Sequence, residues 1–382
     1  MFIATEDWFF ASHYLPMAKA AREMGLDVVV VARVRNHRPA IESAGARLIN
    51  LEAERSSLNP FAIAGTVLSL VRIIRRERPA AVQCIALRAI LLGGLAARLA
   101  GCRRRIYFVT GFGFLGARRD RLGHAARWLL RRALRGPFDG SDTRFLFEND
   151  QDPLVLGFKH GQSAKVTVVG GAGVEPGNYE TAPPPPRPPL RVAIVSRMLW
   201  SKGLDIAVTA VRGARAHGYP VELSLYGSPD PSNPRAVPEQ TLQAWSAEEG
   251  IKWRGSASDV SSVWRLHHVC CLPSRGGEGL PRTLLEGAAC GRAIVTTAVP
   301  GCSTFVRDGI EGLIVPPDDP EALELALIRL AKDAALTDRL GRAARERVLS
   351  GFTERHTRET VKQLYERVLA PEKTEPLTVN RQ

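Results

Sequence analysis

The segment that carries the most structural information runs Pro273-Ser274-Arg275-Gly276-Gly277-Glu278-Gly279-Leu280-Pro281-Arg282-Thr283-Leu284-Leu285-Glu286. The apolar run 269–272 before it predicts a short buried strand. Residues 283–290 favour a helix that Gly291 is suited to end, and Pro281 fits the first helical turn, where its missing N–H costs nothing. The sequence therefore predicts a strand, a glycine-rich turn and a helix whose free N–H groups face a cleft, an arrangement that favours phosphate binding.

Two carboxylates lie in this segment, Glu278 in the predicted turn and Glu286 in the predicted helix. Glu286 is about 1.5 turns into the helix, so the two acids can contact opposite ends of one extended ligand, such as a phosphate flanked by sugars. Acids at this spacing are also common as solvated surface groups. The pair alone therefore leaves both interpretations open.

A second informative segment, Val195-Ser196-Arg197-Met198-Leu199-Trp200-Ser201-Lys202-Gly203, overlaps the end of a predicted buried strand, 190–195. In open α/β sheets, ligands bind outside the carboxyl ends of the strands. Arg197 can bind two oxygens of a diphosphate with its planar guanidinium, and Lys202 can add a point charge. Without a partner motif, an arginine and a lysine near a turn are usually exposed surface charges.

Strand and helix patterns alternate along both halves of the chain, which predicts doubly wound parallel sheets. In the first half, the predicted strands are 2–5, 27–31, 81–85, 105–110 and 144–147. The proline-rich segment 181–189 can join neither a helix nor a central strand and predicts an extended connector. We therefore predict an N-terminal domain over 1–182, a linker over 183–189, a C-terminal domain over 190–351, a terminal helix over 352–369 and a tail over 370–382.

The composition is that of a globular protein with two domains. The chain has 382 residues, of which 45% are hydrophobic and 24% charged, and this length exceeds one ordinary core. The sequence has no window of about 20 uninterrupted apolar residues, and its first residues lack a basic signal-peptide head. The six cysteines lack the spacing of metal ligands or disulfides, so we expect a reduced cytoplasmic protein.

The positive charge is concentrated in the first half of the chain. Residues 1–187 contain 27 Lys and Arg against 16 Asp and Glu, whereas the remaining residues contain 25 against 23. Such an excess predicts an anionic partner, either a membrane surface or a nucleic acid, unless the basic surface is merely solvated. The segment Arg118–Arg135 is basic, amphipathic and contains Trp128, which is typical of helices that dock on anionic membranes. The alternative is a solvated helix packed on its own domain.

Two further motifs suggest other chemistry. Gly111-Phe112-Gly113-Phe114-Leu115-Gly116 has the form of a dinucleotide-binding fingerprint. It follows a late strand of its domain, and the next acid at a strand end, Glu148, lies 32 residues beyond Gly116 instead of about 20. Asp150-Gln151-Asp152 matches a metal-binding motif of an unrelated transferase fold, but its place before a short helix favours capping. We expect neither NAD nor a metal to bind.

Taken together, the Arg197/Lys202 and Glu278/Glu286 pairs resemble the signature of glycosyltransferase family 4, the retaining glycosyltransferases of GT-B fold. Similar segments follow in register: Trp253-Arg254-Gly255-Ser256, Pro300-Gly301-Cys302, Asp308-Gly309-Ile310-Glu311-Gly312-Leu313-Ile314-Val315-Pro316 and Asp318-Asp319. The sequence departs from the family at Ser303-Thr304, where Arg-Glu is frequent, and at Ser196, which replaces a common glycine. The resemblance implies two Rossmann-like domains facing a central cleft, with the terminal helix crossing back to the first domain.

The resemblance also implies roles for individual residues. Arg197 and Lys202 would bind the diphosphate of a nucleotide-sugar donor, and Glu286 would hold its ribose. Glu278 would be the catalytic residue and would contact the donor sugar together with the backbone of Gly279, Leu280 and Pro281, while the loop with Gly111 and Gly113 would face the cleft. Fixed cations stabilise charge on the departing diphosphate, and a carboxylate favours an oxocarbenium-like sugar. No metal or cofactor is therefore implied.

The function that the resemblance implies is transfer of an N-acetylhexosamine or hexose from a UDP-sugar to a saccharide or polyprenyl-diphosphate-linked acceptor in surface glycan synthesis. The expected location is cytoplasmic, or peripheral on the inner face of the cytoplasmic membrane, and no nucleic acid is implied. Two alternatives remain open. A sugar-nucleotide epimerase of the same architecture would convert UDP-N-acetylglucosamine without an acceptor. A non-catalytic basic protein would bind nucleic acid or membrane, and DNA binding would be salt-sensitive.

Overall fold

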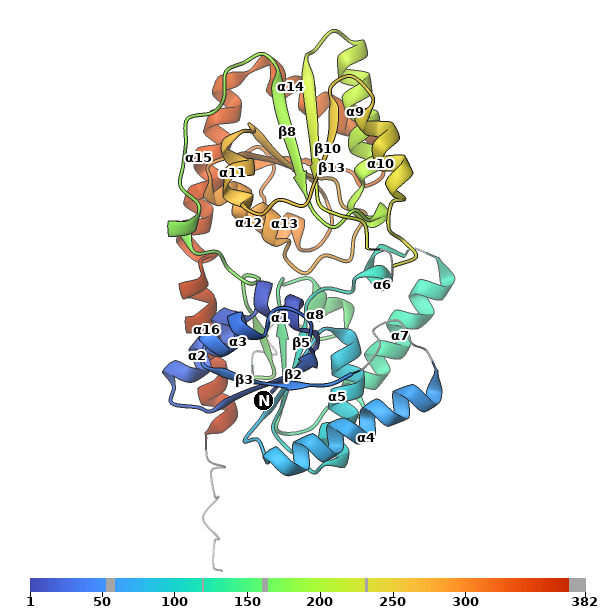
Figure 1. Cartoon of the computed structure of the whole chain (residues 1–382), viewed down its shortest axis with the longest axis vertical. Coiled ribbons are helices and arrows are strands. Elements are labelled where there is room, and N and C mark those ends of the chain that lie inside the picture. The colour runs from blue at the N-terminus through green and yellow to red at the C-terminus, as the bar shows by residue number, and fades with distance from the viewer. Residues whose placement is uncertain (53–58, 119, 160–163, 231–232, 371–382) are drawn as a thin grey trace, which may run out of the picture.

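Two parallel β-sheets organise the chain, one in each half (Figure 1). The computed structural model describes residues 1–52, 59–118, 120–159, 164–230 and 233–370. Within these residues, the N-terminal sheet has seven strands in the order β3-β2-β1-β4-β5-β6-β7, and the C-terminal sheet has six in the order β10-β9-β8-β11-β12-β13. The predicted doubly wound fold is confirmed.

The strand bounds agree closely with the sequence pattern. The N-terminal strands are β1 (Phe2–Glu6), β2 (Val28–Arg33), β3 (Ala46–Asn50), β4 (Val82–Ile85), β5 (Arg105–Val109), β6 (Thr143–Phe147) and β7 (Val166–Val168). The C-terminal strands are β8 (Leu190–Val195), β9 (Val221–Tyr226), β10 (Ile251–Gly255), β11 (Val269–Leu272), β12 (Ala293–Thr297) and β13 (Gly312–Val315). The pattern missed β3 and β7, which are short strands at the two edges of the N-terminal sheet.

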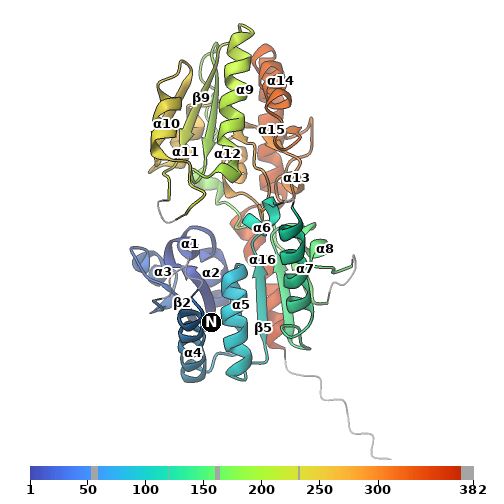
Figure 2. The ribbon, with the colours of Figure 1, turned by 90° about the vertical axis from the view of Figure 1, so that its right-hand side faces the viewer.

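Helices cover both faces of each sheet (Figures 1 and 2). On the N-terminal sheet, one face carries α2 (Leu15–Glu23), α3 (Arg38–Ser43) and α16 (Glu354–Leu369), and the other carries α4 (Pro60–Glu77), α5 (Leu87–Leu99) and α7 (Arg121–Arg135). The C-terminal sheet packs against α9 (Leu204–Ala216), α10 (Glu239–Ser246), α11 (Val260–Arg265), α12 (Arg282–Ala289), α14 (Pro320–Lys332) and α15 (Ala334–Gly351). None of the helices among the described residues is long and apolar enough to span a bilayer.

Four short helices lie between the two sheets: α1 (Asp7–His13), α6 (Phe114–Ala117), α8 (Asp152–Val155) and α13 (Cys302–Phe305). The carboxyl ends of the two sheets face each other across this level (Figure 1). The residues after the strands of both domains therefore line a common cleft, which is where ligands of parallel sheets bind.

The basic segment 118–135 forms a single helix over all but its first residues. The helix α7 begins at Arg121, because Asp120 Oδ1 accepts the N–H of Gly123 at 2.9 Å and caps its first turn. The preceding glycine-rich loop holds the separate short helix α6 instead.

The last described helix, α16, packs on the N-terminal domain. Its residues Val361, Leu364 and Tyr365 are buried in the same core as Met17 of α2. The hydroxyl of Tyr365 donates to Gln83 Oε1 at 2.8 Å, so a buried polar contact also ties α16 to β4. Residues 181–189 connect the sheets without forming a helix or strand, and the exact domain boundaries given above stay a prediction.

Shortening Leu364 to alanine should loosen the N-terminal domain selectively. The side chain is 1% exposed, and deleting such a buried leucine usually costs about 2–5 kcal/mol. Hydrogen-exchange mass spectrometry of Leu364→Ala should show faster exchange in β1, β2 and α2. The matched variant Leu330→Ala, in the C-terminal core, should instead affect β8 and β9. Unchanged exchange in the N-terminal sheet of Leu364→Ala would contradict the packing of α16.

Candidate active site

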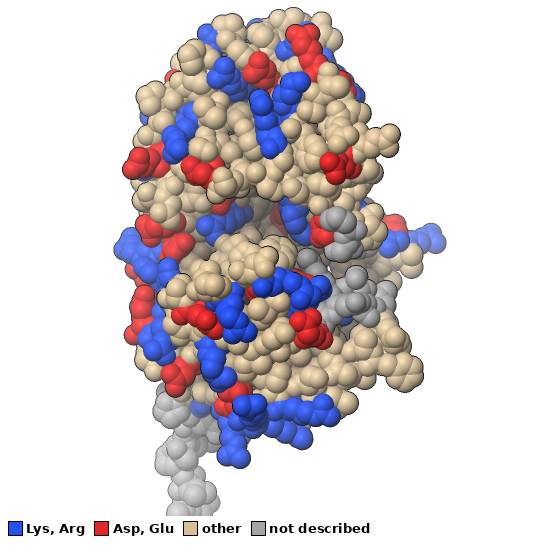
Figure 3. Space-filling model, viewed as in Figure 1, with Lys and Arg blue, Asp and Glu red and all other residues tan. Residues whose placement is uncertain are grey.

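The residues predicted to bind the donor line one cavity of about 900 Å³ between the domains. The face shown in Figure 3 is hollowed between the two halves of the molecule. The cavity is lined from the C-terminal domain by Arg197, Lys202, Glu278, Gly279, Leu280, Pro281 and Glu286, and from the N-terminal domain by Gly111 and Gly113. The structure thus brings all the predicted site residues to one place.

The cationic and acidic motifs meet because β8 and β11 are neighbours in the sheet. Lys202 ends the 3-10 turn η2 (Trp200–Lys202), and its ammonium donates to both carboxylate oxygens of Glu278, at 2.8 and 2.9 Å. Ser274 Oγ donates to Glu278 Oε1 at 2.7 Å. Burial would raise the pKa of Glu278, but the Lys202 charge and these hydrogen bonds hold that pKa below its ordinary value. The site therefore holds an ionised carboxylate beside an ammonium group.

Glu286 lies in α12 and is buried, with 8% of its surface exposed. Its Oε1 accepts hydrogen bonds from the Tyr179 hydroxyl at 2.9 Å and from Arg282 Nε at 2.8 Å. Burial raises the pKa of Glu286, and the charge of Arg282 and the two hydrogen bonds offset only part of this effect. Both bonds use the same oxygen, so within the described chain the other oxygen, Oε2, is left to accept a ligand hydroxyl.

The turn between β11 and α12 exposes backbone donors next to Lys202. Gly277 has a φ of 77°, a left-handed conformation that glycine adopts without strain. Among the described residues, the N–H groups of Gly277, Glu278 and Gly279 have no hydrogen-bond acceptor. Unpaired N–H groups beside a cation and ahead of a helix form a favourable site for an anion.

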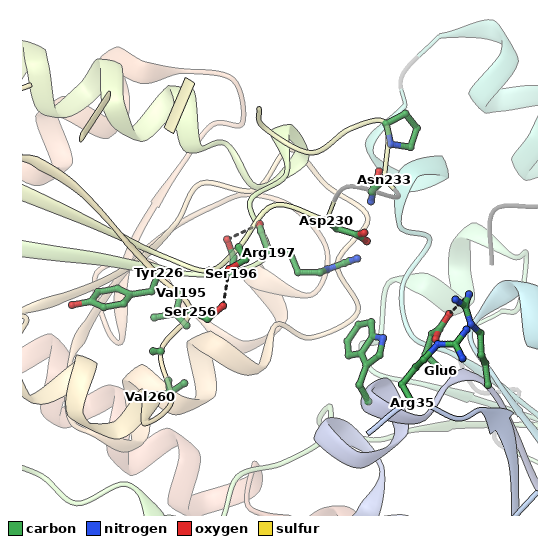
Figure 4. Close-up of a pocket in the computed structure, with 16 residues that line it drawn as sticks. Glu6, Arg35, Val195, Ser196, Arg197, Tyr226, Asp230, Asn233, Ser256 and Val260 are labelled. Carbon is green, nitrogen blue, oxygen red and sulfur yellow. Dashed lines mark hydrogen bonds and ion pairs between the residues drawn. The ribbon is translucent and has the colours of Figure 1, made fainter. Parts of the chain in front are cut away.

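Arg197 borders a second cavity of about 930 Å³ that adjoins the first. Figure 4 shows Arg197 extending from the end of β8 between two walls. Ser196 and Ser256 lie on the C-terminal wall, and Glu6 and Arg35 lie on the N-terminal wall. The two cavities together form a cleft long enough for a ligand with several parts, since both are lined by Arg197 and by Trp8.

His13, the last residue of α1, also lines the first cavity. Burial lowers the pKa of His13 to about 4, and the nearby charge of Arg282 adds to the effect. The imidazole is therefore neutral at neutral pH and can donate or accept a hydrogen bond in the cavity. The structure therefore places His13 at the cleft.

The sequence prediction missed four residues that shape this site: Glu148, Asn149, Tyr179 and Arg282. Glu148 and Arg282 line the cavity directly, whereas Tyr179 contacts Glu286 and Asn149 contacts Gly279. The one available signal was that Glu148 and Asn149 directly follow a buried strand, at the edge where parallel sheets bind ligands.

The two alternative motifs take structural roles. The loop 111–116 lies against the turn 277–279, and Gly113 N donates to Gly277 O at 2.9 Å. In the second motif, the helix α8 is capped by Asn149 Oδ1, which accepts the N–H of Gln151 and Asp152, so the expected capping comes from the preceding residue. No group of three or more potential metal ligands occurs among the described residues.

Two family descriptions match the chain. "Glycosyl transferase 4-like" matches residues 1–138, and "Glycosyl transferases group 1" matches residues 189–333. These matches fall on the two domains respectively and include both cavity walls.

Individual relatives agree with the family matches. The chain is 23% identical to N,N'-diacetylbacillosaminyl-diphospho-undecaprenol alpha-1,3-N-acetylgalactosaminyltransferase from Campylobacter jejuni over 93% of this chain and 95% of that protein. It is 30% identical to phosphatidyl-myo-inositol mannosyltransferase from Mycobacterium leprae, but over only 38% of each chain.

Two solved structures share the fold along nearly the whole chain. Anabaena Alr3699/HepE, solved in complex with UDP-glucose, has a TM-score of 0.75 and 14% identity over 96% of this chain and 98% of its own. WaaG, a glycosyltransferase involved in lipopolysaccharide biosynthesis, has a TM-score of 0.66 and 14% identity over 97% and 99%. At this identity, the likeness shows the fold, with two facing α/β domains.

Removing the Lys202 ammonium should leave the buried carboxylate of Glu278 without its cationic partner. Breaking a buried ion pair from one side costs about 3–5 kcal/mol, so Lys202→Met should lower the free energy of unfolding by that order. The double variant Lys202→Met/Glu278→Gln should recover much of the loss. Arg212→Met, which breaks the exposed pair with Glu248, is the control and should change stability by about 0–1 kcal/mol.

The same variants should differ in pH dependence. The folded pKa of Glu278 is depressed, so its stabilising contribution is present above the unfolded pKa and is lost as pH falls through the folded pKa. Without Lys202, burial dominates and raises the pKa of Glu278 above its unfolded value, so the pH dependence should shift to the opposite sign, with stability falling as pH rises through the folded pKa. Denaturation midpoints measured across the acidic range would show this shift, and identical profiles for wild type and Lys202→Met would contradict the pairing.

Proposed function

The chain belongs to the family-4 type glycosyltransferases of GT-B fold, enzymes of glycan and polysaccharide biosynthesis, and on that premise we propose that it transfers a sugar from a UDP-sugar to a lipid-linked or saccharide acceptor with retention at the anomeric carbon. The observation that carries the proposal is the meeting of Arg197, Lys202, Glu278 and Glu286 around one interdomain cavity. The transferred sugar is proposed to be an N-acetylhexosamine or a hexose.

Each part of the donor has its own place in the cleft. Arg197 and Lys202 bind the diphosphate, with the unpaired N–H groups of the turn 277–279 on its other side. Glu286 Oε2 accepts a ribose hydroxyl, because Oε1 is already held by Tyr179 and Arg282. The nucleoside extends into the second cavity, past Arg197. UDP is the proposed nucleotide because the structural neighbour HepE was solved with UDP-glucose.

The chemistry follows from this placement. Breaking the anomeric C–O bond leaves its electron pair on the β-phosphate, and Lys202, Arg197 and the turn N–H groups stabilise the added negative charge where it develops. Glu278, ionised beside Lys202, stabilises the positive charge of the sugar. The acceptor oxygen forms the new bond on the same face, and its proton passes to the departing phosphate oxygen. No separate protein base is needed for this step.

The acceptor is proposed to be a lipid-linked saccharide, such as a polyprenyl-diphosphate-linked one. The relative from Campylobacter jejuni that matches nearly the whole chain is named for a diphospho-undecaprenol acceptor. The N-terminal domain, which would receive the acceptor, also carries most of the excess positive charge of the sequence. A diphosphate linked to a membrane lipid is an anion, so this positive charge would attract it.

We further propose that the helices α4, α5 and α7 form a surface that docks on an anionic membrane. Eight of the 16 large apolar side chains exposed in the described chain lie on these three helices: Phe61, Leu68, Leu91, Leu95, Leu99, Leu122, Trp128 and Leu129. The same helices contain ten arginines and one acid, Glu77. Exposed apolar groups interleaved with arginines favour an interfacial position.

The docking surface lies close to the proposed acceptor path. α7 follows the loop 111–116, whose Gly111 and Gly113 line the cavity, and Figure 2 shows α4, α5 and α7 in the half of the molecule below the cleft. A headgroup held at this surface would therefore have a short path to the donor sugar. The enzyme would act peripherally on the inner face of the cytoplasmic membrane.

Donor binding should depend on Glu286. Calorimetric titration with UDP should show that Glu286→Ala weakens binding by about 10- to 100-fold. This is the usual loss of affinity when a hydrogen bond to a charged group is removed. Glu324→Ala, on the outside of the same domain beside His217, is the control and should bind UDP normally. A panel of UDP-sugars should then identify the donor by hydrolysis. Epimerised product, or failure of wild type to bind any nucleotide sugar, would contradict the proposal.

Membrane docking should require the apolar side chains of α7. In co-sedimentation with vesicles containing phosphatidylglycerol, wild type should bind at low salt, and Trp128→Ser/Leu129→Ser should bind at least about tenfold more weakly. Leu325→Ser removes a leucine that is 61% exposed in the C-terminal domain and serves as the control. Binding that is equal on neutral vesicles, or unchanged in the double variant, would reject this surface.

A further inference from the structure

Four consecutive residues after β6 each hydrogen-bond the C-terminal domain. Their contacts are Glu148 Oε2 with Leu280 N at 2.8 Å, Asn149 Nδ2 with Gly279 O at 2.8 Å, Asp150 Oδ1 with Thr304 Oγ1 at 3.0 Å, and Gln151 Nε2 with Ser303 Oγ at 3.3 Å. Ser303 and Thr304 are the positions at which this chain departs from its family. We call residues 148–151 the clasp.

The inner half of the clasp is rigidly held. Asn149 is fully buried, and all its polar positions are used: Nδ2 donates to Gly279 O and Asp152 Oδ2, and Oδ1 accepts from the N–H groups of Gln151 and Asp152. Glu148 is 5% exposed and accepts from Leu280 N–H and from the Tyr14 hydroxyl. Because their side chains are fixed by the N-terminal domain, these residues can fix the backbone that they contact.

The backbone that the clasp contacts is the turn that carries Glu278. Asn149 and Glu148 hold Gly279 O and Leu280 N, and Gly113 N holds Gly277 O from the other side. Glu278 thus lies between three interdomain hydrogen bonds. The turn belongs to the C-terminal domain, but its backbone is fixed by groups of the N-terminal domain.

Accordingly, we propose that Glu148 and Asn149 are positioning residues for sugar transfer, which hold the turn 277–280 in its reactive conformation only when the two domains are closed. The proposal rests on the proposed glycosyl transfer and adds a requirement to it. Nucleotide binding rests mainly on Arg197, Lys202 and Glu286, whose side chains the clasp does not contact, so it should largely survive loss of the clasp. Bond cleavage uses Glu278 and the turn N–H groups, so it should not.

The physical reason is geometric precision. A reacting group displaced by about 1 Å can lose about 100-fold in rate even when its chemistry is intact. Without the clasp, the turn would keep the bond from Lys202 to Glu278 but lose two of its three interdomain hydrogen bonds, those made by Glu148 and Asn149. Assembling the reactive turn only on closure also limits hydrolysis of the donor in the open enzyme.

Asn149→Asp tests the proposal with little change in shape. The carboxylate cannot donate to Gly279 O, so kcat for transfer or UDP-sugar hydrolysis should fall about 100-fold, while the Kd for UDP changes less than about threefold. Thr337→Ala is the matched control: it removes a buried hydrogen bond of the C-terminal domain outside both cavities and should leave kcat intact. Normal kcat in Asn149→Asp would overturn the proposal.

Hydrogen exchange gives a readout that does not depend on activity. In wild type with UDP, the Leu280 amide should be protected by Glu148, and Asn149→Asp should expose the peptide 276–283 without affecting β8 or β9. If wild type neither binds UDP nor hydrolyses UDP-sugars, the proposed function fails. If wild type is active, and Asn149→Asp is also active with its Leu280 amide still protected, the proposed role of the clasp is rejected but the proposed function is not.

Titration of Glu148 should make kcat depend on pH. Burial raises the pKa of Glu148 to about 8, and the charges of Asp152 and Glu278 raise it while the bonds from Leu280 and Tyr14 lower it. Asp152 is also buried, and burial raises its pKa to about 7. Below pH 8 Glu148 is therefore largely uncharged, and above it a new negative charge appears against the turn 277–280, where we propose that the diphosphate binds.

Glu148→Gln should separate this role from a merely structural one. Glutamine resembles the protonated acid and keeps an acceptor for Leu280 N–H, so activity near pH 7 should be retained. The fall in kcat of wild type above pH 8 should be absent in Glu148→Gln, whereas Asp152→Asn should keep it. An alkaline limb that is identical in wild type and Glu148→Gln would refute the role of Glu148.

Discussion

The cleft of this enzyme depends on a place where two peptide backbones meet with no side chain between them. A Cβ on Gly111 would lie 2.4 Å from Gly279 N, and a Cβ on Gly277 would lie 1.8 Å from Gly113 O. Neither distance is compatible with a real side chain, so glycine is required on both sides. This contact lets the N-terminal domain hydrogen-bond the turn that carries Glu278 and makes one site out of two domains.

Around this contact, the buried charges are paired rather than isolated. Lys202 neutralises Glu278, and Arg282 neutralises Glu286 from the preceding helical turn. Burying such groups is unfavourable unless each has a partner, which explains why the acids are found with cations within 3 Å. A donor diphosphate can share these cations without creating an unpaired buried charge. This arrangement is therefore suited to an anionic ligand.

The N-terminal domain carries a surface that the fold alone does not require. One face of its sheet is covered by helices rich in exposed leucine, tryptophan and arginine, whereas the other face buries α2 and α16. Much of the excess positive charge in the first half of the sequence thus lies on the helices α4, α5 and α7. The proposed donor site and the proposed docking surface are separated in space but joined through the loop 111–116.

The local pattern of the sequence predicted the parallel sheets and the bounds of seven strands, because buried strands and glycine-rich turns leave strong short-range signals. The roles of Arg197, Lys202, Glu278 and Glu286 came from the family resemblance instead. It missed the edge strands β3 and β7, which depend on pairing with distant residues, and it began the basic helix at Arg118 where α7 begins at Arg121. Only the tertiary structure decided that Glu148 and Asn149 reach Gly279 and Leu280. That contact spans about 130 residues and exists only when two separate sheets face each other, so no local pattern encodes it.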